Sequence, residues 1–185
     1  DEEATDVNSF RKAMLRYQFA VPIEQCLNPY NDWRAIEEQY FSSYPEMIYV
    51  DNLLSPAALD EFRKFCLIST VWKKEYPNQY LGAFASVGFV SELHMRIAAE
   101  LKQKLPRIFG EHKLEQLWSY KYNSTLKKGI NVHADSAKVN LNFWITPDEA
   151  NLDPESGGLI VYDVPAPPTW GFDEYNMHEQ GIYDF

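Results

Sequence analysis

His133 and Asp135 are the residues whose types and spacing point most directly to chemistry. If residues 129–135 are extended, side chains alternate between two faces, so Asn131, His133 and Asp135 point to the same side. An imidazole and a carboxylate then converge on one point. Together they are two of the three ligands of the 2-His-1-carboxylate arrangement, which holds Fe(II) and leaves positions open for substrate and oxygen.

A His-x-acid pair is a weak signal when taken alone. The chain contains 4 His and 27 Asp plus Glu among 185 residues, so at least one such pair is expected by chance with a probability of about one half. The simplest alternative for His133 is a half-buried strand histidine with a hydrogen-bonded neighbour. The flanking sequence must therefore decide between the two interpretations.

The composition predicts a soluble globular protein with one main domain. At 185 residues and 21.6 kDa, with 45% hydrophobic and 15% aromatic residues, the chain is long enough to bury a core. It has no apolar run long enough to span a membrane, and its formal charge of -10 opposes binding to nucleic acid or anionic membranes. Cys26 and Cys66 make no disulfide framework, so a reducing, cytoplasmic location is expected.

Residues 1–45 are expected to form a helical extension laid on the domain that follows. The spacing of apolar residues predicts a first helix capped by Asn8 or Ser9 and a second helix capped by Asn31 or Asp32. Both helices carry aromatic residues on one face. Such stripes are typical of packing surfaces rather than of ligand sites.

The domain over residues 46–185 begins with a strand predicted at residues 47–50. Ser55 then caps a helix with Pro56 at its first position, and a second helix runs over residues 91–105. His94, in the first turn of this second helix, is expected to be a surface or capping residue. The face of the first helix expected to be buried consists of Leu59, Phe62, Phe65 and Cys66.

The hydrophobic period changes from helical to alternating after residue 114. Strands are predicted over residues 117–122, 129–135, 139–145 and 159–162. Loops rich in Pro, Asp, Asn and Gly separate these segments. Short strands with regular turn signals are typical of an all-β sandwich or jelly roll.

The motifs of this region follow one another in a distinctive order. Tyr122 and a turn precede His133-Ala134-Asp135; an apolar strand, an acidic loop and Glu155-Ser156-Gly157-Gly158-Leu159 follow. Upstream, a helix follows the phrase Pro45-Glu46-Met47-Ile48-Tyr49-Val50-Asp51-Asn52-Leu53-Leu54-Ser55. Over roughly residues 45–165 this order resembles the Fe(II)- and 2-oxoglutarate-dependent dioxygenases of the prolyl-hydroxylase-like type.

The resemblance implies an α+β fold, a double-stranded β-helix or jelly roll over residues 46–185 with helices packed on it. In such a fold His133 and Asp135 would ligate Fe(II). Tyr122, Asn142 and Trp144 would look into the pocket of the co-substrate 2-oxoglutarate. The implied reaction hydroxylates a protein side chain or a small molecule, consumes 2-oxoglutarate and O₂, and releases succinate and CO₂.

Two parts of the family's pattern are not found in this sequence. The family uses a second histidine late in the barrel and an Arg or Lys beyond it, which pairs with the far carboxylate of 2-oxoglutarate. His178 is the only histidine after Asp135, and no cation follows it before Phe185. We therefore expect that the chain is cut short, with the third ligand, the cationic anchor and the closing strands beyond Phe185.

Other interpretations of the same residues stay open. A non-catalytic β-helix module would recognise a partner through its acidic, aromatic-rich surface. A cupin-like metal protein would use His133, Asp135 and His178 without 2-oxoglutarate. Tyr122 and Trp144 are equally compatible with ordinary packing inside a barrel, whereas Asn142 would need hydrogen-bond partners there because it carries a buried amide.

Overall fold

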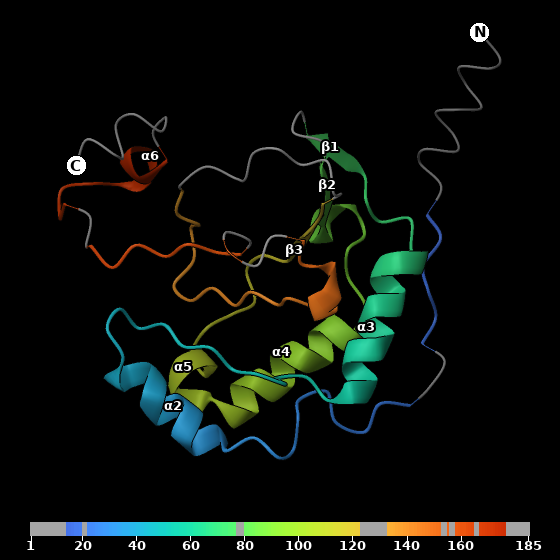
Figure 1. Ribbon diagram of the computed structural model, residues 1–185, viewed down its shortest axis with the longest axis horizontal. Helices are drawn as coiled ribbons and strands as arrows, with labels where there is room; N and C mark the ends of the chain where they lie inside the picture. Colours follow the sequence, from blue (N-terminus) through green and yellow to red (C-terminus); the bar gives the residue numbers. More distant parts are fainter. Residues whose placement is uncertain are drawn as a thin grey trace, which may run out of the picture.

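The computed structural model describes residues 14–19, 22–76, 80–122, 133–152, 155, 158–164 and 167–176. Helices lie beside a small antiparallel sheet in an α+β arrangement (Figure 1), which confirms the predicted class. The helices are α2 (Trp33–Ser42), α3 (Pro56–Ile68), α4 (Glu92–Lys104), α5 (Pro106–Phe109) and α6 (Phe172–Tyr175), with 3₁₀ turns η1 (Ala85–Val87) and η2 (Asp148–Ala150). The sheet has the order β1 (Lys74–Tyr76), β2 (Tyr80–Phe84), β3 (Trp118–Lys121). No helix among the described residues has the length and apolar character needed to cross a membrane.

The three long helices begin where local sequence signals predict. Asp32, Ser55 and Ser91 each precede a helix and accept, on a side-chain oxygen, the backbone N–H three residues further on. Each cap satisfies an N–H group that no carbonyl of the helix can reach. Pro56 occupies the first position of α3, where its missing N–H costs nothing.

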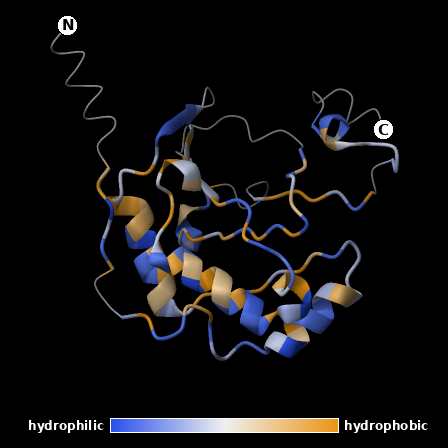
Figure 2. Ribbon diagram, turned by 180° about the vertical axis from the view of Figure 1, so that it is seen from behind, coloured by the Kyte–Doolittle hydropathy of each residue, from blue (hydrophilic) through white to orange (hydrophobic). Residues whose placement is uncertain are grey.

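The hydrophobic core is built mainly from α3 and α4. Phe62, Phe65 and Cys66 of α3 are buried, as predicted, whereas Leu59 is only partly buried. The buried residues of α4 include Leu93. Along both helices hydrophobic and hydrophilic residues alternate (Figure 2), so each helix turns one face inward and leaves the other to solvent.

His94 is buried, so the prediction of a surface position was wrong. It is 4% exposed, and its ring meets those of Phe62, Phe65 and Phe89 at centroid distances of 4.8, 5.3 and 4.8 Å. Its Nδ1 lies 2.7 Å from Ser91 Oγ, while its Nε2 has no hydrogen-bond partner in the part of the chain that the structure describes. Burial lowers the pKa of His94 to about 4, because an imidazolium there would lose its hydration.

Residues 14–19 do not form the predicted helix; residues 1–13 lie outside the described part of the chain. Instead, the segment runs beside the end of α3. The backbone N–H groups of Leu15 and Tyr17 donate to the side-chain oxygens of Thr70 and Ser69, at 2.8 and 3.0 Å. The two hydroxyls accept N–H groups that, in a helix, would donate to backbone carbonyls of the same helix.

Glu100 of α4 joins the N-terminal region to the main core. Its carboxylate accepts the backbone N–H groups of Cys26 and Leu27, each at 2.9 Å. Cys26 and Leu27 are fully or almost fully buried. One carboxylate therefore satisfies two backbone donors that have no strand or helix to bond to.

Several predicted strands are absent from the described residues. Residues 47–50, 139–145 and 159–162 form no strand, and residues 133–135, the described end of the predicted strand 129–135, are also irregular. The strand predicted at residues 117–122 is confirmed by β3, and the irregular strands and loops expected over residues 71–90 are confirmed by β1 and β2. An extended segment becomes a strand where a neighbour supplies backbone hydrogen bonds, and the described sheet supplies them to β1, β2 and β3. The double-stranded β-helix is therefore not confirmed.

We predict that the free energy of unfolding falls between about pH 6.5 and pH 4 because of His94. The native pKa is lowered to about 4, whereas the unfolded chain takes up the proton near 6.5. The unfolded state binds more protons in this window, so the contribution is complete above about pH 6.5 and lost toward pH 4, by at most about 3 kcal/mol.

Urea unfolding of the wild type and of His94→Leu, at about pH 7 and about pH 4.5, tests this prediction. The difference in stability between the two pH values should be smaller in His94→Leu. The control His112→Leu changes a histidine outside the core and should keep the wild-type difference. An unchanged difference in His94→Leu would contradict the prediction.

A second prediction concerns the carboxylate that holds the N-terminal region. Glu100→Ala should destabilise the protein by about 1–3 kcal/mol, because two buried N–H groups lose their acceptor. Glu100→Gln keeps one acceptor oxygen and should cost less. Chemical denaturation measures the free energy of unfolding of the wild type and both variants. Equal stability of Glu100→Ala and the wild type would refute the assigned role.

Candidate functional site

The structure brings His133 and Asp135 together. His133 Nε2 lies 3.8 Å from Asp135 Oδ1, and the two side chains are 46% and 34% exposed. The pair is therefore accessible to solutes. Its residues converge on one side of the chain although the segment is not paired as a strand.

Asp135 is oriented by an amide that the sequence analysis did not single out. Asn140 Nδ2 donates to Asp135 Oδ2 at 3.2 Å, and the backbone N–H of Ala137 donates to the carbonyl of Asp135 at 2.8 Å. The turn after Asp135 thus returns the chain toward its carboxylate. One carboxylate oxygen is engaged by Asn140, and the other faces His133.

The segment that carries the pair is also tied to α6. Asn176, at the end of this helix, accepts the backbone N–H of Ala134 on Oδ1 at 3.3 Å. Its Nδ2 donates to the carbonyl of Phe172 at 2.8 Å. A single side chain therefore connects the residue between His133 and Asp135 to the last helix of the described chain.

Residues 139–145 follow the pair and are anchored to α3 on one side. Val139, Phe143 and Ile145 are partly buried and pack against the core. The ring of Phe143 lies 6.4 Å from that of Phe62, and the guanidinium of Arg63 donates to the carbonyl of Ile145. Two neighbouring residues of α3 thus fix this segment.

Asn140, Asn142 and Trp144 lie on the other, exposed side of the same segment. Of these three residues, Asn140 contacts the carboxylate of Asp135. Trp144 is 62% exposed, and Asn142 is also exposed. Both side chains are open to solvent, so neither is packed in the interior of the described chain.

Tyr122 lies apart from this group, with the tyrosines of the sheet. Its ring centroid is 5.3 Å from that of Tyr80 and 6.4 Å from that of Tyr120. Burial, and then the neighbouring Tyr80, raises the pKa of Tyr122, so its phenol is a hydrogen-bond donor at neutral pH. The predicted site residues therefore fall into two groups, one on residues 133–144 and one on the sheet.

A third metal ligand is not found in the described part of the chain, where no three His, Cys, Asp or Glu side chains are grouped to hold one ion. His178, the candidate from the sequence, lies outside the described residues. Burial raises the pKa of Cys26 and Cys66 to about 12, so both thiols stay protonated and are poor ligands.

Asn140 and Asn176 are the residues that sequence reasoning missed. The alternation at residues 139–145 could have indicated Asn140, because it places this amide on the same face as Asn142 and Trp144. No local pattern indicates Asn176, whose contact with Ala134 joins residues far apart in the chain.

In comparisons with protein-family models, curated proteins and solved structures, nothing matches this chain.

Proposed function

We propose that this protein is a non-haem Fe(II)- and 2-oxoglutarate-dependent dioxygenase that hydroxylates a protein side chain or a small molecule. The observation that carries the proposal is the distance of 3.8 Å between His133 Nε2 and Asp135 Oδ1. Imidazole and carboxylate ligands bind metal ions at about 2.0–2.2 Å, so both atoms can reach a single ion. The order of motifs around the pair supports the same conclusion.

The ligand types of His133 and Asp135 fit an iron site. Imidazole and carboxylate are the ligands of the 2-His-1-carboxylate site, which is typical of Fe(II) oxygenases. The proposal places the second histidine outside the described residues, with His178 as one candidate. The buried free thiols Cys26 and Cys66 support a reducing, cytoplasmic location.

The proposed fold is the double-stranded β-helix of that family. Burial over residues 139–145 supports it, because Val139, Phe143 and Ile145 face the core while Asn142 and Trp144 face outward. Apart from Leu141, which is 40% exposed, this alternation is the pattern of a strand with one covered face. Residues 139–145 therefore have the side-chain pattern of a strand, although no neighbouring strand pairs with them among the described residues.

Each side chain of the site has a definite task in this proposal. When bound, iron with 2-oxoglutarate and O₂ supplies the oxidising chemistry that hydroxylates a C–H bond. Asn140 fixes one oxygen of Asp135 and thereby orients the other toward His133. Asn142 offers an amide donor to the co-substrate, and Trp144 offers an apolar wall that limits access of water.

The test is iron-dependent succinate formation from 2-oxoglutarate and O₂. The wild type, loaded with Fe(II) without oxygen and then aerated, should bind iron and form succinate. His133→Ala and Asp135→Ala should lose both properties, because each removes a ligand. His112→Ala removes a histidine outside the site and should behave as the wild type.

Three results would overturn the proposal. Succinate formation that survives in both ligand variants would show that another site does the chemistry. Metal binding without turnover, lost in His178→Ala, would favour a cupin-like metal protein. Partner binding that needs no metal, by a chain that binds no iron, would favour a non-catalytic module.

A further prediction concerns the amide beside the metal ligands. Asn140→Ala should weaken metal binding by about tenfold, because the Asp135 carboxylate loses the hydrogen bond that orients it. Asn142→Ala removes the same kind of amide from a side chain that is not bonded to Asp135 and should leave metal affinity unchanged. Calorimetric titration with Co(II) compares the two, and equal affinities would exclude the orienting role of Asn140.

A further inference from the structure

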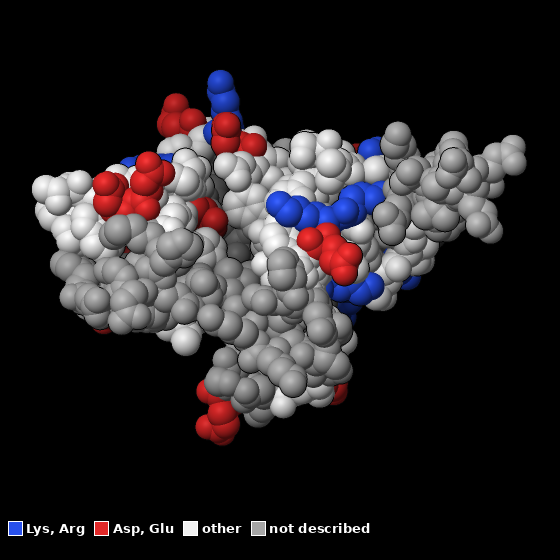
Figure 3. Space-filling view, turned by 90° about the horizontal axis from the view of Figure 1, so that it is seen from above, with Lys and Arg blue, Asp and Glu red and all other residues white. Residues whose placement is uncertain are grey.

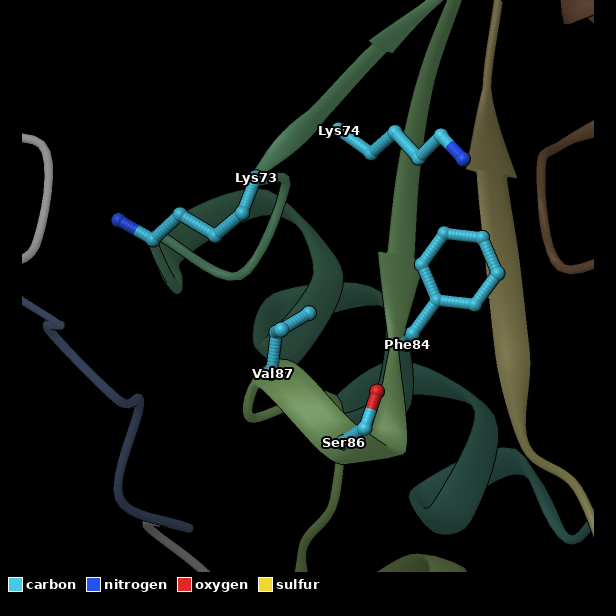
Figure 4. Close-up of a pocket in the computed structure, with 5 residues that line it drawn as sticks. All are labelled: Lys73, Lys74, Phe84, Ser86 and Val87. Carbon is cyan, nitrogen blue, oxygen red and sulfur yellow. The ribbon is translucent and has the colours of Figure 1, made fainter.

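We call His133 and Asp135, the ligands of the proposed ion, the metal pair. The pocket drawn in Figure 4 lies elsewhere, beside β1, β2 and η1; it has a volume of about 290 Å³ and is lined by Lys73, Lys74, Phe84, Ser86 and Val87. The two lysines extend in opposite directions (Figure 4), so their ammonium groups do not converge on one ligand. The described helix that is bonded to the segment of the metal pair is α6.

α6 is a short helix outside the hydrophobic core. It has four residues and lies away from α3 and α4 (Figure 1), and its Phe172, Asp173 and Glu174 are all exposed. A single helical turn is not stable by itself in water. A segment with few buried groups also opens at a low cost in free energy. We therefore expect α6 to exchange between a docked and a detached state.

Local hydrogen bonds give α6 its shape. At its start, the carboxylate of Glu174 accepts the backbone N–H of Gly171 at 2.8 Å. At its end, the backbone N–H of Asn176 donates to the carbonyl of Asp173 at 3.2 Å. The side-chain Nδ2 of Asn176 donates to the carbonyl of Phe172 at 2.8 Å. Because these bonds join neighbouring residues, the helix can move as one unit.

Asn176 also connects α6 to the metal pair. Its Oδ1 accepts the backbone N–H of Ala134, the residue between His133 and Asp135, at 3.3 Å. The two partners fix the orientation of the amide, because the carbonyl of Phe172 needs a donor and the N–H of Ala134 needs an acceptor. A flipped amide would lose both bonds. In the docked state of α6, one oxygen atom therefore holds the backbone at the middle of the metal pair.

The bond to Ala134 takes the place of a neighbouring strand. Side chains two residues apart point the same way where the backbone between them is extended, and in a sheet the ladder of hydrogen bonds keeps it extended. Residues 133–135 are not paired as a strand, so Asn176 supplies a hydrogen bond of the kind that a ladder would supply. Without it the peptide between His133 and Asp135 is freer to rotate, and the two ligands spend less time facing one ion.

We propose that Asn176 is a positioning residue and that the docking of α6 controls the affinity of the metal pair for its ion. The inference rests on the proposed function, from which it takes the metal at His133 and Asp135. Docked α6 favours metal binding, and by reciprocity a bound metal favours docked α6 by the same factor. A substrate or partner that detaches α6 therefore loosens the ion, and one that holds α6 docked retains it.

Calorimetric titration of the full chain with Co(II) measures the effect on metal affinity. Asn176→Leu removes the bond to Ala134 and should weaken Co(II) binding by about fivefold, the effect of losing one exposed hydrogen bond. Asn176→Asp keeps an acceptor oxygen for Ala134 and should retain most of the affinity. The matched control is Asn31→Leu, because the amide of Asn31 likewise donates to a backbone carbonyl, that of Asn52, at 3.3 Å. This control should bind Co(II) as tightly as the wild type.

Hydrogen exchange of the backbone amides of residues 169–176, followed by mass spectrometry, tests the reciprocal effect. Saturating Co(II) should slow this exchange by about fivefold in the wild type and should not change it in Asn176→Leu or His133→Ala. If Asn176 only shaped α6, Asn176→Leu would raise the exchange, but Co(II) would not affect it in any variant. Groups of acidic side chains lie on the face seen in Figure 3, so the Co(II) binding of His133→Ala is subtracted as the background of surface carboxylates.

The outcomes separate this inference from the proposed function. If Asn176→Leu binds Co(II) as tightly as the wild type, or if Asn176→Asp loses as much affinity as Asn176→Leu, the positioning role is overturned, even where the wild type forms succinate. If affinity and exchange change as expected but no succinate forms with Fe(II), 2-oxoglutarate and O₂, α6 controls a metal site and the dioxygenase proposal falls. A wild type that binds Co(II) no better than His133→Ala overturns both. Circular dichroism of each variant checks that the fold is retained.

Discussion

The rest of the structure depends on the packing of three phenylalanine rings around the imidazole of His94. Phe62 and Phe65 come from α3, and Phe89 precedes α4, so their contacts with His94 join the two main helices. Each of the three phenylalanine rings also contacts an aromatic ring outside this cluster. Phe65 stacks on Phe19 of the N-terminal segment, Phe89 lies against Trp72 before the sheet, and Phe62 meets Phe143 beside the site.

This cluster explains how a site made of irregular segments can have a defined geometry. Residues 139–145 pair with no strand of the described residues, yet Phe62 and Arg63 hold Phe143 and Ile145 against α3. With Val139, Phe143 and Ile145 packed against the core, Asn140 lies on the exposed side, where it meets Asp135. The position of Asn140 on the exposed side of residues 139–145 therefore depends on the packing of the other side against α3.

The helices could be predicted because their signals are local. Ser55 and Ser91 lie directly before the helices that they cap, and the apolar spacing follows one turn after another. The closeness of His133 and Asp135 was predictable for the same reason, since only Ala134 lies between them in the chain. Strand pairing is different. β3 pairs with β2 across a long stretch of chain, and alternation alone wrongly predicted strands at residues 139–145 and 159–162. His94 was missed because the polar first turn of a helix gives no sign that aromatic rings from another helix will enclose it.

The hydrogen bond from Asn140 to Asp135 has a consequence for denticity. A carboxylate with both oxygens available can take two positions around a cation. In Asp135, Oδ2 is engaged by the amide and only Oδ1 faces the imidazole, so in the proposed metal site this carboxylate would bind through one oxygen. Such a one-oxygen ligand would leave the proposed ion more room for exchangeable ligands than an aspartate that binds through both oxygens.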